Sequence, residues 1–145
     1  MKLFSAIGLF SFFATATFSQ TPSTLQNLKG TYVFTQQGSV QSNQSITGLG
    51  LMTFDGNGNV SCIETLQIPG ANVVSNCSGK YSIGADGSAS IEILYDSNFT
   101  TNPAADSDVQ IASARFKVYI TGSGKLLKGI RTENGVFILA NFEKN

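Results

Sequence analysis

The stretch Gly48–Cys62 has the sequence GLGLMTFDGNGNVSC, in which one alternating run precedes the turn residues at Asp55 and a second run follows them. A period of two is typical of a β-strand with one buried face. Asn and Gly between two such runs are typical of tight hairpin turns, because both residues accept positive φ angles. The stretch therefore predicts a β-hairpin with strands over residues 48–54 and 60–67.

Alternating runs bounded by turn residues recur along the rest of the chain. They predict further strands over residues 30–35, 79–83, 88–95, 109–121, 125–131 and 136–142. The segments between them contain few residues that could be buried, so the longer ones are predicted as polar surface connections. These connections are residues 36–47 and 96–108. Residues 68–76 contain the turn dipeptide Pro69-Gly70 and are predicted as the connection that ends the preceding strand.

Eight strands joined mostly by short turns predict an all-β fold. We expect a single antiparallel eight-stranded up-and-down barrel, because closure of such a meander removes exposed strand edges. A two-sheet sandwich is the alternative. A trial register for the last three strands pairs Phe116 with Gly129 and places Lys117 beside Lys128 on the outer face.

The first residues have the features of a secretory signal peptide, with Lys2 before an apolar run that is followed by small residues. We assign residues 1–19 to this peptide, with cleavage between residues 16 and 20. The run is too short to cross a bilayer, so no transmembrane anchor is expected in the mature chain. Residues 20–28 are expected to form a flexible lead-in, and residues 29–145 the barrel domain of a secreted protein, extracellular or periplasmic.

Cys62 and Cys77 are the two cysteines of the chain, and both lie in its exported part. An even cysteine count in an oxidising compartment favours a disulfide. Closing a loop of this length would stabilise the fold by about 3 kcal/mol in the chain-entropy model.

The composition argues against several kinds of chemistry. The chain has no His and a formal net charge of zero, with 12% charged residues. It therefore lacks Ser-His and Cys-His nucleophilic arrangements, and nothing in its charge points to nucleic acid. Asp55–Asn59 resembles the start of a calcium loop, but Val60 and Leu66 stand where such a loop needs Gly and Glu. We expect no metal and no cofactor.

The inward faces of the predicted strands define the candidate ligand-binding residues. Alternation places one set of large apolar side chains inside the barrel. Our first hypothesis is therefore a secreted non-enzymatic barrel that binds a small apolar molecule or serves as an envelope or matrix component. The candidate residues that would line its interior are Tyr32, Phe34, Met52, Phe54, Phe116 and Val118.

Two other classes of function remain open. A barrel enzyme of the cyclase or isomerase type would need a buried carboxylate, and the candidates are Glu64, Glu92, Asp96 and Asp108. An interaction module would use a basic strand face, and the basic residues gathered late in the chain are Arg115, Lys117, Lys125, Lys128 and Arg131.

Three segments carry a resemblance to a known family: Gly30–Phe34, Met52–Val60 and Gly79–Ile83. Across nearly all of the mature chain, the sequence resembles short secreted bacterial β-barrel domains of unknown function. That resemblance implies a barrel and no established activity. A weaker similarity is to the calycin superfamily of lipocalins and avidins, where a first-strand Trp packs under an Arg from the last strands. This similarity implies that Tyr32 takes the place of the Trp and Arg131 that of the Arg. Allene oxide cyclase-like barrels share the architecture alone.

Overall fold

The computed structural model describes residues 24–40, 44–69, 71–99 and 111–145 of the chain. The predicted signal peptide, residues 1–19, and the candidate carboxylate Asp108 lie outside these ranges. Within the described residues, no helix has the length and apolar character needed to cross a membrane.

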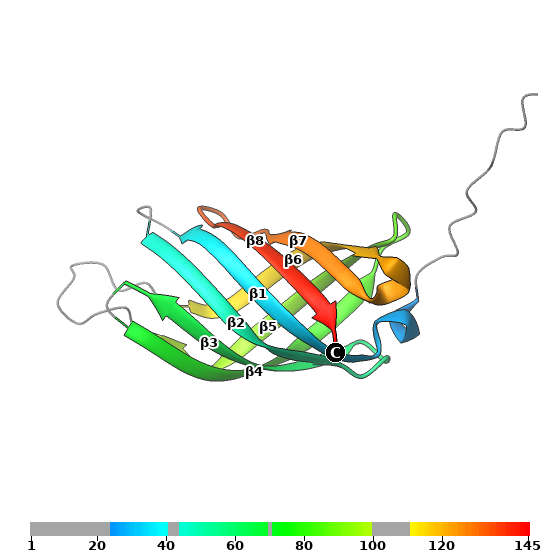
Figure 1. Cartoon of the computed structure of the whole chain (residues 1–145), viewed down its shortest axis with the longest axis horizontal. Helices are drawn as coiled ribbons and strands as arrows, with labels where there is room; N and C mark the ends of the chain where they lie inside the picture. Colours follow the sequence, from blue (N-terminus) through cyan, green and yellow to red (C-terminus); the bar gives the residue numbers. More distant parts are fainter. Residues whose placement is uncertain (1–23, 41–43, 70, 100–110) are drawn as a thin grey trace, which may run out of the picture.

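Eight antiparallel strands form a closed barrel in which each strand pairs with its neighbours in sequence and the last strand pairs with the first (Figure 1). The predicted eight-stranded up-and-down barrel is confirmed, and the sandwich alternative is excluded. The strands are β1 (Gly30–Val40), β2 (Gln44–Phe54), β3 (Asn59–Ile68), β4 (Ala71–Ile83), β5 (Ser88–Phe99), β6 (Ile111–Thr121), β7 (Leu126–Arg131) and β8 (Phe137–Lys144).

Two short 3-10 helices, η1 (Leu25–Leu28) and η3 (Gly122–Gly124), lie at one end of the barrel, which we call the η1 end. Leu28 is fully buried there, and the hydroxyl of Tyr81 donates a hydrogen bond to the carbonyl of Leu25. The sequence predicts a flexible lead-in over residues 20–28. Within it, residues 25–28 form η1 and are packed against the barrel instead. The last residues of β1, β3, β5 and β7 and the first residues of β2, β4, β6 and β8 lie at the other end of the barrel, which we call the opposite end.

Aromatic side chains fill the half of the barrel next to the η1 end. Phe34 stacks on Phe142 with ring centroids 5.6 Å apart, and Phe54 meets Tyr81 edge-on at 4.9 Å. An eight-stranded barrel is just wide enough for inward side chains to fill it. This half is therefore a packed core that supports the rest of the fold.

Several strands are longer than predicted. β1 continues to Val40 and β2 begins at Gln44, so the prediction of a polar surface connection over residues 36–47 is wrong. β4 likewise begins at Ala71 and β5 continues to Phe99, inside the predicted connections 68–76 and 96–108. In the first case, three of the five inward positions are polar or glycine (Gln36, Gly38 and Gln44), so the hydrophobic signal of a strand is weak although the alternation of burial continues to Val40 and Ile46.

The register of the β6–β7 hairpin differs from the trial register by two residues. Phe116 lies opposite Arg131 rather than Gly129, and Lys117 lies opposite Ile130 rather than beside Lys128. The reason is the turn, in which Ser123 has a φ of 56° between two glycines of positive φ. A shift of two preserves the face of every side chain, so the predicted inward set is still inward.

Candidate functional site

Five buried side chains with polar atoms come from five different strands in the half of the barrel next to the opposite end. Each occupies an inward position of its strand's alternation, so the fold turns all five toward the barrel axis. We call this set the polar layer. Its members are Gln36 on β1, Glu64 on β3, Ser75 on β4, Tyr95 on β5 and Arg131 on β7.

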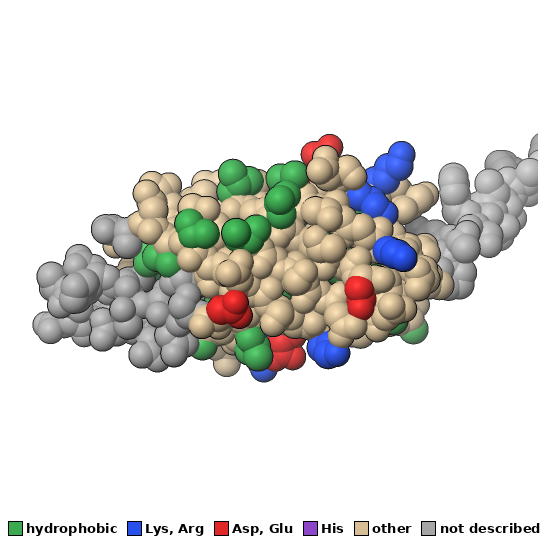
Figure 2. Space-filling model, turned by 90° about the horizontal axis from the view of Figure 1, so that it is seen from below, with side chains coloured by type: hydrophobic (Ala, Val, Ile, Leu, Met, Phe, Trp, Pro, Cys, Tyr) green, Lys and Arg blue, Asp and Glu red, His purple; other side chains and the backbone are tan. Residues whose placement is uncertain are grey.

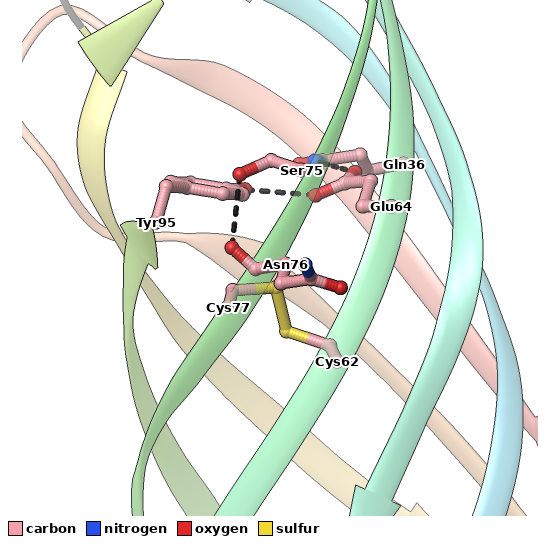
Figure 3. Close-up of a disulfide and its surroundings, with 7 residues drawn as sticks. All are labelled: Gln36, Cys62, Glu64, Ser75, Asn76, Cys77 and Tyr95. Carbon is pink, nitrogen blue, oxygen red and sulfur yellow. Dashed lines mark hydrogen bonds between the residues drawn. A yellow bond between two sulfur atoms is a disulfide. The ribbon is translucent and has the colours of Figure 1, made fainter. Parts of the chain in front are cut away.

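Glu64 lies at the centre of the polar layer and is 1% exposed. One carboxylate oxygen accepts a hydrogen bond from the side-chain amide of Gln36, and the other accepts one of 2.8 Å from the hydroxyl of Tyr95. Figure 3 shows these contacts beside the disulfide. Burial raises the pKa of Glu64, although both hydrogen bonds and the charge of Arg131 act to lower it.

Gly48 on β2 leaves the room that this arrangement needs. A Cβ atom added at Gly48 would lie 2.1 Å from the Glu64 Oε1 atom and 2.7 Å from the Gln36 Cγ atom. The absence of a side chain at this inward position therefore allows the Glu64 and Gln36 side chains to meet over β2.

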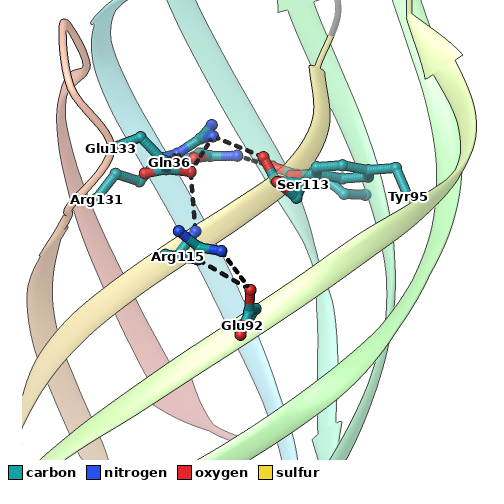
Figure 4. Close-up of polar contacts among 8 residues, drawn as sticks. Gln36, Glu92, Tyr95, Ser113, Arg115, Arg131 and Glu133 are labelled. Carbon is teal, nitrogen blue, oxygen red and sulfur yellow. Dashed lines mark hydrogen bonds and ion pairs between the residues drawn. The ribbon is translucent and has the colours of Figure 1, made fainter.

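Arg131 is the buried cation of the polar layer, with a side chain 3% exposed. Its Nη2 atom lies 2.7 Å from the carboxylate of Glu133 and donates to the carbonyl of Ser113 at 3.1 Å. Its guanidinium lies 5.9 Å from the ring centroid of Phe116. Figure 4 shows this cluster next to the exposed Arg115–Glu92 ion pair on the outer wall.

Two atoms of the polar layer lack a partner in the structure as described. Gln36 Oε1 and Arg131 Nη1 are buried and form no hydrogen bond; the Oε1 atom of Gln44, on β2, is a third such atom outside the layer. Both side chains act on Glu64, since Gln36 hydrogen-bonds to its carboxylate and the charge of Arg131 acts to lower its pKa. Buried polar groups without partners are uncommon in folded proteins and point to a bound molecule or water.

Apolar side chains enclose the polar layer on the side of the opposite end. They come from the same strands as the polar layer or from strands next to them, and each is at most 6% exposed. The layer is therefore a polar belt between two apolar regions. The enclosing residues are Val40, Ile46, Leu66, Ile68 and Ile138.

The six residues predicted to line a ligand site all face inward, and each is at most 2% exposed. They lie in the η1 half and pack against one another or against other rings; the rings of Tyr32 and Phe54, for example, are 5.2 Å apart. Their role in ligand binding stays a prediction. This set is Tyr32, Phe34, Met52, Phe54, Phe116 and Val118.

The expected packing of Arg131 over Tyr32 is wrong. Arg131 lies over Phe116, and the cation over the Tyr32 ring is Lys144, at 5.8 Å from the centroid. The Tyr32 hydroxyl donates to the carbonyl of Gly124. Burial, followed by the neighbouring Tyr81, raises the pKa of Tyr32 to about 12. Tyr32 therefore anchors the η1 end of the barrel. It lies two residues before Phe34 on β1, whose ring stacks on that of Phe142.

The other candidate carboxylates that the structure describes lie outside the barrel. Glu92 and Asp96 are exposed, and Glu92 forms an ion pair of 2.9 Å with Arg115. Asp55–Asn59 is the stretch that resembles the start of a calcium loop. There, the Asp55 carboxylate accepts hydrogen bonds from the backbone N–H groups of Asn57 and Asn59, as in a turn. Among the described residues, no group of three His, Cys, Asp or Glu side chains is placed to hold a metal.

The outer wall carries hollows of its own. One hollow, of about 510 Å³, is lined by Tyr119, Ile130 and Leu139, with Lys117 and Lys128 at its border. Each of the three apolar residues is more than half exposed. Figure 2 shows one face of the molecule, on which hydrophobic side chains gather among uncharged ones and charged groups are scattered. A ligand-binding experiment must therefore distinguish binding inside the barrel from binding in this hollow on the outer wall.

Replacement of Glu64 by Gln tests the burial of its carboxyl. A carboxyl whose pKa is raised on folding stabilises the fold only at low pH, and that contribution is lost as the pH rises through the folded-state pKa. The free energy of unfolding of Glu64→Gln, relative to the unchanged protein, should therefore rise as the pH is raised above the ordinary pKa of a Glu carboxyl, about 4, and level off once the folded-state carboxyl is ionised. The rise is about 1.4 kcal/mol for each tenfold difference between the acid dissociation constants of the carboxyl in the folded and unfolded chain. Urea unfolding at several pH values measures it.

The exposed Glu92→Gln variant is the matched control for this experiment, because it removes a carboxylate from the outer wall. A stability difference between Glu64→Gln and the unchanged protein that stays constant with pH would contradict the buried, ionisable carboxyl.

Comparison with known proteins supports the fold. No family model matches the chain, and no curated protein matches it. A solved structure described as EF1p2_mFAP2b bound to DFHBI matches with a TM-score of 0.54 and 12% sequence identity, over 85% of this chain and 100% of that one. Likeness at this identity is evidence of a shared fold, and the chain is thus similar to another β-barrel.

Proposed function

We propose that this protein is a secreted, non-enzymatic barrel that binds a small, largely apolar molecule inside, with a polar group of that molecule on the polar layer. The observation that carries the proposal is the pair of buried atoms without partners, Gln36 Oε1 and Arg131 Nη1. Both belong to side chains at most 5% exposed, so bulk water does not satisfy them.

The energetic cost of these atoms supports a bound molecule. A buried polar atom without a hydrogen bond costs about 1–3 kcal/mol, and a charged group costs more. A ligand that contacts both atoms would offset that cost on binding. Ordered water is the competing occupant, since buried waters commonly bridge such groups.

The surroundings of the polar layer suit an apolar body. Ile46, Leu66 and Ile138 are each at most 2% exposed and face the barrel axis beside the layer. Small-molecule sites are lined mainly by apolar side chains, with a few polar groups that fix the orientation. EF1p2_mFAP2b, the barrel of similar fold, is described as bound to DFHBI, which is consistent with a small ligand here.

Two features support the secreted location and the non-enzymatic role that the proposal includes. The Cys62–Cys77 disulfide is compatible with an oxidising compartment, which agrees with the predicted signal peptide. Both carboxylate oxygens of Glu64 accept hydrogen bonds from protein groups, which favours a structural and binding role over that of a catalytic base. The cyclase or isomerase alternative would need one of these oxygens to face a substrate.

Titration with N-phenyl-1-naphthylamine, whose fluorescence increases in apolar surroundings, tests the proposal. We expect saturable binding of one molecule per chain. The double variant Ile130→Thr/Leu139→Thr, which makes the outer hollow polar, should bind the dye as the unchanged protein does. Absence of binding, or its loss in this outer-wall variant, would contradict binding inside the barrel.

A further inference from the structure

We infer that the polar layer selects a neutral ligand group that carries a hydrogen-bond acceptor beside a donor, of which a carboxamide is the simplest. This inference rests on the proposed function and names the ligand class of the same site. It follows from the pairing of each polar atom and from the balance of charge.

Arg131 supplies the donor. Its Nε atom donates to the Glu133 carboxylate, and its Nη2 atom donates to Glu133 and to the Ser113 carbonyl. Nη1 is the remaining nitrogen, buried and without a partner. The ligand atom that meets it must therefore be an acceptor, such as a carbonyl oxygen.

Gln36 supplies the acceptor. Its side-chain nitrogen donates to Glu64, which leaves the carbonyl oxygen Oε1 free. Glu64 does not take the place of the ligand at Nη1, since its oxygens accept from Gln36 and Tyr95 and Nη1 has no partner. A ligand group that satisfies both free atoms needs an acceptor for Nη1 and a donor for Oε1, and a carboxamide has both.

The charge of the site favours a neutral group over an anion. Arg131 carries the positive charge, but the Glu133 carboxylate 2.7 Å away balances it. Glu64 is a second acidic group in the same layer, and no other Lys or Arg is buried among the described residues. A carboxylate ligand would add a negative charge to a site with no unbalanced cation, at a desolvation cost that the site does not compensate.

A matched series of probes with one aromatic body tests the inference on the unchanged protein. The probes are 2-naphthamide, 2-naphthoate and methyl 2-naphthoate, which present an acceptor with a donor, an anion, and an acceptor alone. We expect the amide to bind about ten-fold or more tightly than either of the others at neutral pH, because a site left with an unpaired buried group rejects the analogue. Calorimetric titration measures the three affinities.

A pair of double variants tests which side chains make the selection. Arg131→Met/Glu133→Gln removes the buried ion pair, and Arg115→Met/Glu92→Gln removes its exposed counterpart on the outer wall. The buried variant should bind the amide more weakly than the unchanged protein does, because the Nη1 donor is gone, whereas the exposed variant should bind it with unchanged affinity. Binding of N-phenyl-1-naphthylamine to each variant reports whether its interior is intact.

The outcomes separate this inference from the proposed function. Equal affinity for the three probes, or preference for 2-naphthoate, together with dye binding inside the barrel, would overturn the amide selection alone. Absence of binding by all the probes and by the dye would overturn the proposed function as well and identify water as the occupant. An affinity for the amide that is unchanged in the buried variant would also overturn the inference.

Discussion

Replacement of Phe34 by Ala is expected to lower the free energy of unfolding by about 3–5 kcal/mol, the usual cost of truncating a fully buried Phe. Phe34 is 0% exposed and lies directly opposite Phe142 in the pairing of β1 with β8, the strand pair that closes the barrel. The two rings stack at 5.6 Å. The cavity would thus open at the closure itself, where few neighbours could move to fill it. Chemical denaturation followed by circular dichroism measures the loss.

Phe137→Ala is the matched control for this variant. Phe137 is also on β8, but it points outward and is 78% exposed. Its removal should change the stability by less than about 0.5 kcal/mol, as for most surface substitutions. Equal effects of the two variants would contradict the placement of the aromatic core and the closure of the barrel through β1 and β8.

Removal of the disulfide is expected to have the next largest effect. Cys62 and Cys77 are directly opposite each other in the β3–β4 pair, with Cα atoms 4.9 Å apart and a sequence separation of 15. The double variant Cys62→Ala/Cys77→Ala should lose about 3 kcal/mol of stability, because the unfolded chain regains the freedom that the closed loop removes. The shift of the urea midpoint measures this loss.

Addition of a thiol reductant to each protein provides the control. It should lower the stability of the unchanged protein and leave that of the double variant as it was. Mass measurement shows whether the disulfide is fully reduced. If the unchanged protein then keeps its urea midpoint, the stabilising role of the disulfide is wrong.

The disulfide also supports the polar layer, since Glu64 and Ser75 form a cross-strand pair two residues from the two cysteines (Figure 3).

The architecture could be predicted because the relevant signals are local. The turn residues around Asp55 mark a hairpin, and two positive-φ glycines, Gly56 and Gly58, occupy it as expected. Alternation placed Tyr32 and Phe116 inside, and it is insensitive to the two-residue error in the β6–β7 register. The predicted disulfide is confirmed because Cys62 and Cys77 share the inward face of adjacent strands.

The polar layer could be predicted only in part. Glu64 has the same inward spacing as Cys62 and Leu66, yet a charged residue in a strand is ordinarily outside, so alternation alone gave no reason to single it out. Gln36 lies in a stretch with little hydrophobic signal, which led to the wrong prediction of a surface connection. The contact between these residues depends on the space over Gly48, and that space exists only once β1, β2 and β3 are paired.

The position of a bound probe is the most direct test of ligand binding inside the barrel. Proton–nitrogen NMR spectra resolve the side-chain N–H groups of Arg131 and Gln36, and the exposed Arg115 provides an internal reference. On titration with N-phenyl-1-naphthylamine, we predict large shifts of the Arg131 and Gln36 side-chain signals and little change at Arg115. Shifts confined to outer-wall residues such as Tyr119, Ile130 and Leu139, with Arg131 and Gln36 unchanged, would contradict the account.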